Sequence, residues 1–516
     1  MIAVACLATD LGMGFPFEHG LRTTLMAMRL ADLLDVAAEM RSQTYYASLL
    51  TYSGCTTDAA ESARIFGQSL TSNIASVEHG SRAEALRGVV RALPPPGTSP
   101  LRRPYEVVRR LPLAARFERP HYAALCEVAS MLAERLGLPG VVSSLFAFLT
   151  ERWDGEGVLG RAEGDAIPLP IRVVHVARDA AYQRLLGGDE YAARIVRERA
   201  GHAFDPEIAS RLADRAGQIM AEADAPGSVW EAVLAAEPRP WPTLQPPEVD
   251  RALSAIGNFA DLVSPSLSGH SEGVAELVEN AARVAGFNEA EARLARRAAH
   301  VHDLGRVAVH PRIWAKTGRL TADESEQVRL HAYHTERVLS PSPALAHLGG
   351  VAGAHHERLD GSGYHRGVGG GVLAPAARLV AAADAFHAMT EPRSHRAPLA
   401  PEQAADVLAR ETQAGKYDPE LVAAVVTAAG LPAPAIERPV GLTRREAEII
   451  GLLARGLQTK QVARTLGISV KTADNHIQSA YRKLGVSTRA AATLFAMENG
   501  LVPWGELPIP RPSTAS

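Results

Sequence analysis

The chain has few cysteines and few aromatic residues. Its 516 residues include three cysteines, Cys6, Cys55 and Cys126, which are scattered and odd in number. Neither a disulfide framework nor a cysteine zinc site is therefore expected. Aromatic residues make up 5% of the chain, whereas alanine is abundant. Because alanine has the highest helix propensity, helices should dominate the fold.

The chain also lacks a long apolar run and a strong net charge. No apolar stretch reaches the ~18 residues of a membrane span. The mildly apolar N-terminus (MIAVACLATDLGMG) has no basic flank of the kind that marks a signal peptide. A soluble, cytoplasmic protein with no membrane partner is expected. The formal net charge of −3 excludes a nucleic-acid-like bias for the chain as a whole.

Proline-rich stretches divide the chain into segments. A length of 516 residues predicts two to four domains. Proline-rich sequences at 237–247 and 431–441 indicate linkers, and a tail at 506–516 should be frayed. The predicted domains are residues 1–236, 248–430 and 442–505.

The first two domains repeat three short motifs in the same order, about 206–213 residues apart. The matched pairs are Glu151–Gly157 with Glu357–Gly363, Ile171–Val174 with Ala377–Val380, and Phe204–Glu207 with Tyr417–Glu420. Ordered self-similarity of this kind indicates a duplicated domain. In the second copy, apolar spacing predicts helices from His270 and over 289–302, 323–339 and 376–389. The glycine-rich segment 357–375 predicts a flexible loop.

Histidine is concentrated in the second copy, where 11 of the 18 histidines lie between His300 and His395. Imidazole is the commonest protein metal ligand. Adjacent residues on a helix point about 100° apart. The neighbouring pairs His302-Asp303 and His355-His356 can therefore serve two ions, or one ion and its bridge. A two-metal phosphohydrolase needs such nitrogen and oxygen ligands on rigid elements.

Residues 248–430 resemble the HD-GYP family of HD phosphohydrolases, through the HD pair at 302–303 and the sequence HHERLDGSGYH at 355–365. The resemblance implies hydrolysis of cyclic di-GMP on two divalent metal ions, Fe or Mn. The ligand positions that it implies are His270, His302, Asp303, His331, His355, His356 and Asp384. His331 is preferred to His334 by its distance from Leu339. Asp303 would bridge the ions and Arg306 would orient the phosphate, so both are predicted catalytic residues.

Three positions in this region depart from the family pattern. Arg306 stands where lysine is usual, and a guanidinium grips a phosphate with different geometry. His365 replaces the proline of the GYP motif, which frees backbone that proline would stiffen. Ser266 occupies the place of a glutamate that binds a third metal in some members, so two ions are expected. His310, His347, His387 and His395 are expected to be surface or packing residues.

In the first copy, most of these positions carry residues that do not bind metals. His19 remains at the position of His270. The replacements are Tyr52 and Ser53 for the HD pair, Leu149 and Thr150 for the histidine pair, and Arg178 for Asp384. A cation at a ligand position argues against metal binding. Residues 1–236 are therefore predicted to be a degenerate HD-GYP-like repeat that packs against the active copy. Ligand sensing in a vestigial cavity is the alternative.

The C-terminal segment has its own charge and its own helix signals. Residues 442–500 contain nine Lys/Arg and four Asp/Glu, which is the electrostatic footprint of phosphate binding. Thr443 and Glu446 form a capping-box signature, and Ser469 is a helix N-cap. The predicted helices are 458–466, 470–484 and 487–499, after a first helix that begins near Thr443.

This segment resembles the LuxR/FixJ-type helix-turn-helix domain, through LTRRE at 442–446, LGIS at 466–469, VKT at 470–472 and KLGV at 483–486. The third helix would enter the major groove of double-stranded DNA. The residues predicted to contact DNA are Lys471, Thr472, Asn475, His476 and Lys483. The resemblance also implies a homodimer.

The sequence therefore predicts an all-α protein, with tandem HD-domain bundles followed by a four-helix LuxR-type domain. The predicted function is that of a transcriptional regulator with a two-metal phosphodiesterase domain. Two alternatives remain open at this point. One is a catalytically silent transcription factor that senses a metal or nucleotide, and the other is a hydrolase of another phosphoester.

Overall fold

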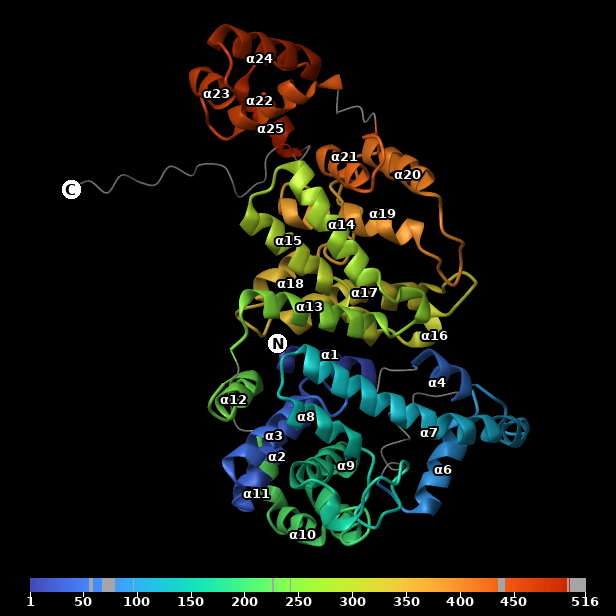
Figure 1. Cartoon of the computed structure of the whole chain (residues 1–516). Coiled ribbons are helices and arrows are strands. Elements are labelled where there is room, and N and C mark those ends of the chain that lie inside the picture. The colour runs from blue at the N-terminus through green and yellow to red at the C-terminus, as the bar shows by residue number, and fades with distance from the viewer. Residues whose placement is uncertain are drawn as a thin grey trace, which may run out of the picture. The chain divides into compact units, whose positions relative to one another are not determined.

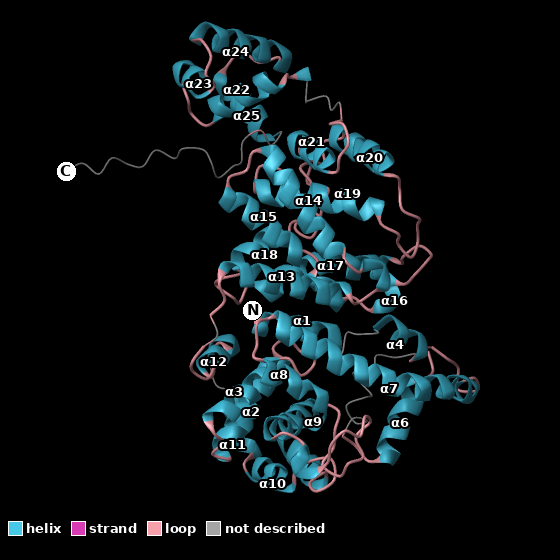
Figure 2. Cartoon of the chain, viewed as in Figure 1, coloured by secondary structure: helices cyan, strands magenta, loops and turns pink. Residues whose placement is uncertain are grey.

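The computed structural model describes residues 1–54, 59–66, 79–95, 97–224, 227–241, 243–434, 441–498 and 501. Within these ranges the fold consists of helices joined by loops, with no named strand (Figure 2). The predicted all-α class is confirmed. Cys55 and the tail 506–516 lie outside the described residues. Among the helices that the structure describes, none has the length and hydropathy needed to cross a bilayer.

The chain forms two compact units, and each is built from two separate segments. Unit 1 comprises Met1–Gly269 and Asp303–Ala346, and unit 2 comprises His270–His302 and His347–Ser516. The elements of unit 1 are α1 (Ile2–Met13), α2 (His19–Leu33), α3 (Ala38–Leu49), α4 (Ala59–Ile65), α6 (Arg82–Ala92), α7 (Arg103–Arg135), α8 (Gly140–Leu145), η1 (Phe146–Phe148), η2 (Gly164–Ala166), α9 (Leu169–Glu198), α10 (Pro206–Asp214), α11 (Ala216–Ala223), α12 (Val229–Ala235), α13 (Pro246–Asp261), η3 (Pro265–Leu267), η4 (Leu304–Ala308), α16 (Pro311–Trp314) and α17 (Ala322–Leu339) (Figure 1).

The elements of unit 2 are α14 (His270–Ala285), α15 (Glu289–Val301), α18 (Ala346–Ala352), α19 (Pro375–Thr390), α20 (Pro401–Gln413), α21 (Pro419–Ala428), α22 (Arg444–Ala454), α23 (Thr459–Thr465), α24 (Val470–Leu484) and α25 (Arg489–Glu498). The predicted helices of the second copy and of the C-terminal segment therefore begin and end within two residues of the observed ones. Capping boxes set the starts of α15, α17 and α22, where Asn288, Thr321 and Thr443 pair with Glu291, Glu324 and Glu446.

In unit 1 the N-terminal helix packs against the turn that follows the HD pair. The residues of α1 from Ala3 to Asp10 are all buried, as expected of a helix that is apolar on most sides. This helix contacts η4 and α17. The Arg312 guanidinium on α16 donates to the carbonyl oxygens of Ala63 and Phe66, at 2.8 and 2.7 Å. Part of the first copy thus supports the segment that carries Asp303.

In unit 2, α14 is the central helix of the layer that carries the candidate ligands. It packs against α15, α19 and α21, and α19 also packs against α15, α20 and α21. The buried positions of α14 recur at helical spacing, namely His270, Val274, Val278 and Ala281. The three helices that carry His270, His302 and Asp384 therefore form one packed layer.

The repeated motifs make the same contacts in both copies. The Arg172 guanidinium bonds to Asp205 at 2.7 Å, and Arg378 bonds to Asp418 at 3.4 Å. Both aspartates also cap the following helix, α10 or α21. In addition, Trp153 N–H donates to Ala203 O at 3.1 Å, and Leu359 N–H donates to Lys416 O at 3.0 Å. We call each Arg–Asp pair with its capped helix a clasp.

The C-terminal helices have a core of their own. Residues from α22, α23, α24 and α25 form one buried apolar cluster, with Ile449, Val462 and Ala480 fully buried. Ser469 caps α24 by accepting from Thr472 N–H at 3.0 Å. Gly485 ends α24 in the left-handed conformation, with φ of 68°, which glycine adopts without steric cost. The predicted caps at Thr443, Ser469 and Gly485 are confirmed.

Candidate functional site

Three of the predicted ligands converge inside unit 2. His270 begins α14, His302 is the C-cap of α15, and Asp384 lies on α19. The Nε2 atoms of His270 and His302 lie 3.1 and 3.5 Å from Asp384 Oδ1. Both histidines are fully buried, and Asp384 is 3% exposed. Their ligand atoms lie within 4.8 Å of one another, which is the spacing of a metal-binding cluster.

The other ring nitrogen of each histidine is held by an acceptor. His302 Nδ1 lies 2.7 Å from Ala299 O, and His355 Nδ1 lies 2.6 Å from Ala352 O. A carbonyl oxygen can only accept, so Nδ1 carries the hydrogen and Nε2 keeps a lone pair. His270 Nδ1 lies 2.8 Å from a carboxylate oxygen of Glu391. Ligating histidines commonly use this arrangement, because it fixes both the tautomer and the ring orientation.

This arrangement fits a metal ion. With Nδ1 committed to acceptors, the neutral rings of His270 and His302 have no hydrogen to give to Asp384. Their Nε2 lone pairs therefore face a carboxylate, and a positive charge is needed among the three groups. Buried imidazole and carboxylate ligands suit divalent transition metals. In the described residues, the His/Asp cluster is thus able to hold a metal ion.

The electrostatics of Asp384 agree with this view. Burial alone would raise the pKa of its carboxyl group. The neighbouring imidazoles of His270 and His302 outweigh burial and hold the pKa of Asp384 well below its usual value. The carboxylate is therefore ionised at neutral pH and available as a ligand.

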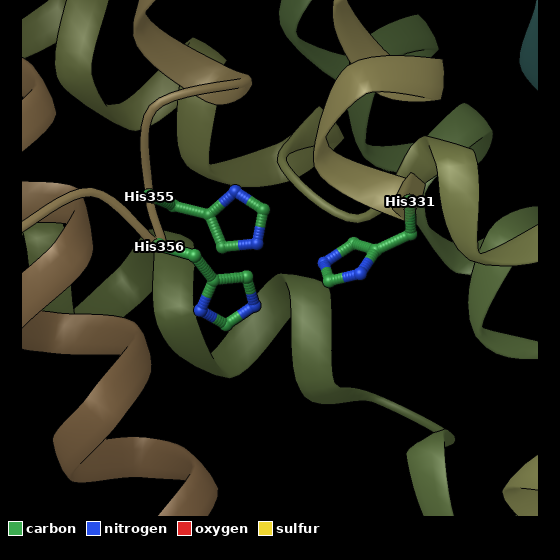
Figure 3. Close-up of side chains that lie close together, drawn as sticks. All are labelled: His331, His355 and His356. Carbon is green, nitrogen blue, oxygen red and sulfur yellow. The ribbon is translucent and has the colours of Figure 1, made fainter. Parts of the chain in front are cut away.

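His355 and His356 follow α18 in unit 2. The His355 ring lies 4.9 Å from the His302 ring and 4.0 Å from the His356 ring, measured between centroids. Tyr364 stacks on His356 at 4.5 Å. Figure 3 draws the two neighbouring rings together with His331 of α17. His355 is fully buried, whereas His356 is partly exposed and so could face a substrate.

The remaining predicted residues form a cluster within unit 1. His331 Nε2 lies 3.2 Å from Asp303 Oδ1, and Arg306 lies 2.6 Å from Asp303 Oδ2. His331 Nδ1 donates to Val328 O, which repeats the pattern of His302 and His355. His331 is buried and His334 is only partly buried, so the geometry favours the choice of His331. Two nitrogens of Arg306, Nε and one terminal nitrogen, have no protein partner among the described residues.

Gly305 explains why the HD pair is followed by Leu-Gly. A Cβ atom at this position would lie 2.0 Å from His331 O and 2.6 Å from Thr335 N, so only glycine lets η4 approach α17 this closely. Gly305 N–H also donates to Thr335 Oγ1 at 2.9 Å. This contact fixes Asp303 against the helix that carries His331.

The glycine-rich loop after the histidine pair is tied down rather than open. The Glu357 carboxylate accepts from Arg366 N–H at 2.7 Å and from Val368 N–H at 3.0 Å. Arg378 donates to Leu373 O at 2.9 Å and also to Gly370 O. The sequence predicted flexibility from glycine content and did not show this buried acceptor, Glu357, inside the loop.

The structure adds three residues that the sequence did not single out. Glu391, Arg393 and His387 surround the outer nitrogen of His270. The prediction had placed His387 at the surface or in packing. A helical signal was present for His387, because it follows Asp384 by three residues and so lies near its face of α19.

In the first copy, the equivalent positions are filled by packed side chains. The Arg178 guanidinium lies 4.5 Å over the Tyr52 ring. The His19 ring lies 4.3 Å from Phe15 and 6.0 Å from Tyr52. Burial, together with the smaller effect of the Arg178 charge, lowers the pKa of His19 to about 4. This aromatic and cationic cluster offers no carboxylate ligand at the place of Asp384.

The predicted DNA-contacting residues lie along α24. Lys471, Thr472 and Asn475 are exposed, and His476 is partly exposed. Lys483 instead bonds to Glu446 at 2.6 Å and to Gly441 O at 3.0 Å. Glu446 also accepts from Ser479 at 2.6 Å. The start of α24 is therefore the open part of this surface, whereas Lys483 is held within the domain.

Two segments of the chain match known protein families. Residues 255–421 match the HD domain, and residues 440–496 match the LuxR family of bacterial regulatory proteins. The chain joins an HD domain to a LuxR-type domain. The HD match includes all seven predicted metal ligands. The LuxR match includes all five residues predicted to contact DNA.

Several known proteins are similar to this chain. The 3′3′-cGAMP-specific phosphodiesterase 3 of Vibrio cholerae serotype O1 is 27% identical over 430 residues, which span 82% of this chain and 93% of that protein. A cyclic di-GMP phosphodiesterase of Thermotoga maritima is 34% identical over 180 residues, or 34% of this chain and 48% of that protein.

A solved structure shares the fold. The crystal structure of a cyclic GMP-AMP-specific phosphodiesterase of V. cholerae matches with a TM-score of 0.57 and 24% identity, and covers 83% of this chain and 97% of that one. At this identity the likeness concerns the fold alone. Because the match covers most of this chain, it extends well beyond the HD domain.

Proposed function

We propose that residues 248–430 hydrolyse a phosphodiester bond of a cyclic dinucleotide on two divalent metal ions, Fe or Mn. The ligands would be His270, His302, Asp303, His331, His355, His356 and Asp384. The observation that carries this proposal is a set of buried histidines whose Nδ1 atoms are bonded to acceptors. The Nε2 atoms of His270 and His302 face the carboxylate of Asp384, and that of His331 faces Asp303. The relatives named for cGAMP and cyclic di-GMP support the substrate class.

Each residue would have a defined role. Bound metal ions would lower the pKa of a water ligand and polarise the phosphoryl oxygens. Asp303 would present one oxygen beside His331 and keep the other on Arg306, at the distances given above. Arg306 would offer its remaining N–H groups to a substrate phosphate, since guanidinium donors match phosphate geometry. The Tyr364 ring would hold His356 in place by stacking.

We further propose that residues 442–505 bind double-stranded DNA as part of a homodimer. Lys471, Thr472, Asn475 and His476 would contact bases or phosphates from the exposed start of α24. Lys483 would contact the DNA backbone only if its ammonium group left Glu446 and bound a DNA phosphate. Residues 1–236 would be a degenerate repeat without metal, with 237–247 and 431–441 as linkers. Hydrolysis or binding of the nucleotide would alter how the DNA-binding domains pair.

The test measures metal content and hydrolysis on the same sample. Protein purified without oxygen should contain Fe or Mn and should cleave cyclic di-GMP or 3′3′-cGAMP. Asp303→Ala should abolish cleavage while DNA binding is kept, and Asp406→Ala, which removes an exposed carboxylate on α20, should change neither. Metal-loaded wild-type protein that cleaves neither nucleotide would favour a sensor or a different phosphoester. Absence of metal would contradict the proposal.

A further inference from the structure

The segment after α19 folds back onto the end of that helix. The Arg396 guanidinium donates to Met389 O at 3.0 Å and to Ala388 O, which are carbonyl groups in the last turn of α19. The backbones of Arg393 and Arg396 pair with each other at 3.0 and 3.2 Å. The segment is therefore anchored at a helix end. This anchoring fixes where Glu391 and Arg393 lie.

The anchored segment brings both residues to His270. Glu391 Oε2 lies 2.8 Å from His270 Nδ1 and 2.8 Å from the Arg393 guanidinium. The same guanidinium lies 3.3 Å from His270 Nδ1. Nδ1 cannot both donate to Glu391 and accept from Arg393. The shorter contact and the acceptor-only carboxylate indicate that Nδ1 carries hydrogen and donates it to Glu391.

His387 and Gly273 complete the surroundings of His270. His387 Nδ1 lies 3.4 Å from Glu391 Oε1, so it contacts the other oxygen of the same carboxylate. A Cβ atom at Gly273, one turn after His270 on α14, would lie 2.2 Å from His387 Nε2. Glycine in the first turn of this helix therefore makes room for the His387 ring. The missing side chain at Gly273 thus lets His387 approach α14 and contact His270 and Glu391.

We propose that Glu391 and Arg393 are positioning residues that fix His270 as an Nε2 metal ligand. Glu391 holds the Nδ1 hydrogen and so fixes the tautomer and the ring plane, while Arg393 holds Glu391. This inference rests on the proposed function, because it assumes that His270 binds a metal. It adds two residues beyond the seven ligands, and both act through His270 rather than on the metal or the substrate.

The physical reason for this role is that a histidine whose ring is not held in one orientation binds a metal ion more weakly. Without an acceptor at Nδ1, the imidazole of His270 loses a contact that fixes its orientation, and the ring can rotate away from Asp384. Loss of such an outer partner typically costs about 10- to 100-fold in metal affinity. Arg393 contributes differently, because its guanidinium holds the carboxylate oxygen that faces His270 Nδ1 and does not itself replace that acceptor. Its loss should therefore have a smaller effect than loss of Glu391.

The experiment measures Mn²⁺ binding to the full chain by isothermal titration calorimetry. Glu391→Ala should weaken the affinity about 10- to 100-fold. Glu391→Gln keeps an oxygen acceptor and should recover most of the loss. Arg393→Ala should fall between Glu391→Ala and the wild type, and Arg393→Lys should lie close to the wild type. Rescue by glutamine separates positioning from a merely structural role, and circular dichroism checks that each variant is folded.

A second readout and a matched control complete the test. The visible absorption spectrum of Co²⁺-loaded protein should change in Glu391→Ala. The spectrum depends on the ligand field of the metal, which depends in turn on the orientation of His270. Glu276→Ala, which removes an exposed carboxylate on the same helix as His270, should change neither readout. Unchanged affinity in a folded Glu391→Ala, or equal losses for alanine and glutamine, would overturn the inference alone. A wild-type protein that binds no Mn²⁺ would instead overturn the proposed function.

Discussion

At the scale of single residues, the geometry of the candidate metal site depends on how closely two helices approach each other as well as on which residues can bind a metal. Asp303 lies beside His331 because η4 packs closely against α17. This close packing is possible because residue 305 is a glycine and has no side chain. The atoms that a Cβ would meet there belong to the backbone of His331 and Thr335, which cannot swing aside. One glycine therefore sets the distance between Asp303 and His331.

Gly305→Ala should destabilise unit 1 and weaken metal binding. Overpacking against backbone typically costs about 1–3 kcal/mol and occasionally more, and the rigid neighbours here predict the upper end of that range. Thermal unfolding and Mn²⁺ titration measure the two effects. Gly318→Ala is the matched control, since a Cβ at Gly318 would meet nothing within 4 Å. Equal stability of the two variants would contradict this explanation.

Glu446 predicts a pH dependence of the C-terminal domain. Burial raises its pKa, but hydrogen bonds from Lys483, Ser479 and Thr443 lower it further than burial raises it, to about 2. Because the folded-state pKa is depressed, the stabilisation is fully present above the unfolded-state value of about 4.3 and is lost as the pH falls toward about 2.

Glu446→Gln should therefore destabilise α22 and α24 by about 1–2 kcal/mol at neutral pH. The difference from the wild type should shrink as the pH falls from about 5 toward about 2. Native-state hydrogen exchange of both helices, compared between the two proteins at each pH, measures it. A difference that does not vary with pH would show that charge on Glu446 is not the cause.

At the scale of elements, α24 combines a capped start with exposed polar residues. Ser469 and Gly485 fix where the helix begins and ends, and Ile477 and Ala480 anchor its inner face. Lys471, Thr472 and Asn475 are left on the outer face near the N-terminus. The end of α24 differs, because Lys483 is neutralised by Glu446. Electrostatic attraction to DNA should thus be concentrated in the first turns.

Lys471→Ala should weaken binding to a short mixed-sequence DNA duplex and lower the slope of log affinity against log salt by about 1. Lys483→Ala should lower this slope less, because the ammonium group is already paired. Fluorescence anisotropy at several salt concentrations gives both slopes. Arg410→Ala, an exposed cation on α20, serves as the control. Equal effects of the two lysines would contradict the role given to Glu446.

Elements proved easier to foresee than the contacts between them. Periodic apolar residues located α15 and α17 within two residues, and the N-cap Ser469 located α24, because these signals are local. The ligand-type residues were likewise visible as His-Asp and His-His pairs. Glu391 and Arg393 were not, since their role depends on a loop that turns back across a helix end. The anchoring of loop 357–375 by Glu357 was missed for the same reason.

At the scale of the whole molecule, two copies of similar sequence hold different chemistry. The second copy surrounds Asp384 with imidazoles, whereas the first places Arg178 over Tyr52 at the corresponding position. Aromatic rings pack around His19 in the first copy, and the vestigial-cavity alternative stays a prediction. The contacts of α1 with η4 give the first copy a supporting role within unit 1.

The two copies offer a matched pair of variants at His19 and His270. His270→Ala should lower the amount of Mn²⁺ bound per chain or its affinity by at least about tenfold. His19→Ala should leave both unchanged, because a guanidinium stands where a carboxylate ligand is needed. Metal analysis after dialysis, together with calorimetry, gives the comparison. A loss of bound metal in folded His19→Ala would show that the first copy is not degenerate.

The clasp has a consequence for how such a chain could have evolved. Arg172 pairs with Asp205 in the first copy and Arg378 with Asp418 in the second. Among the described residues, the His/Asp clusters that could hold a metal all lie in the second copy. A duplicated gene relieved of selection on catalysis would lose its imidazoles first and keep whatever its folding requires. If residues 1–236 are the degenerate repeat proposed above, the clasp is a contact that folding requires in both copies, whereas the metal ligands are required in the second alone.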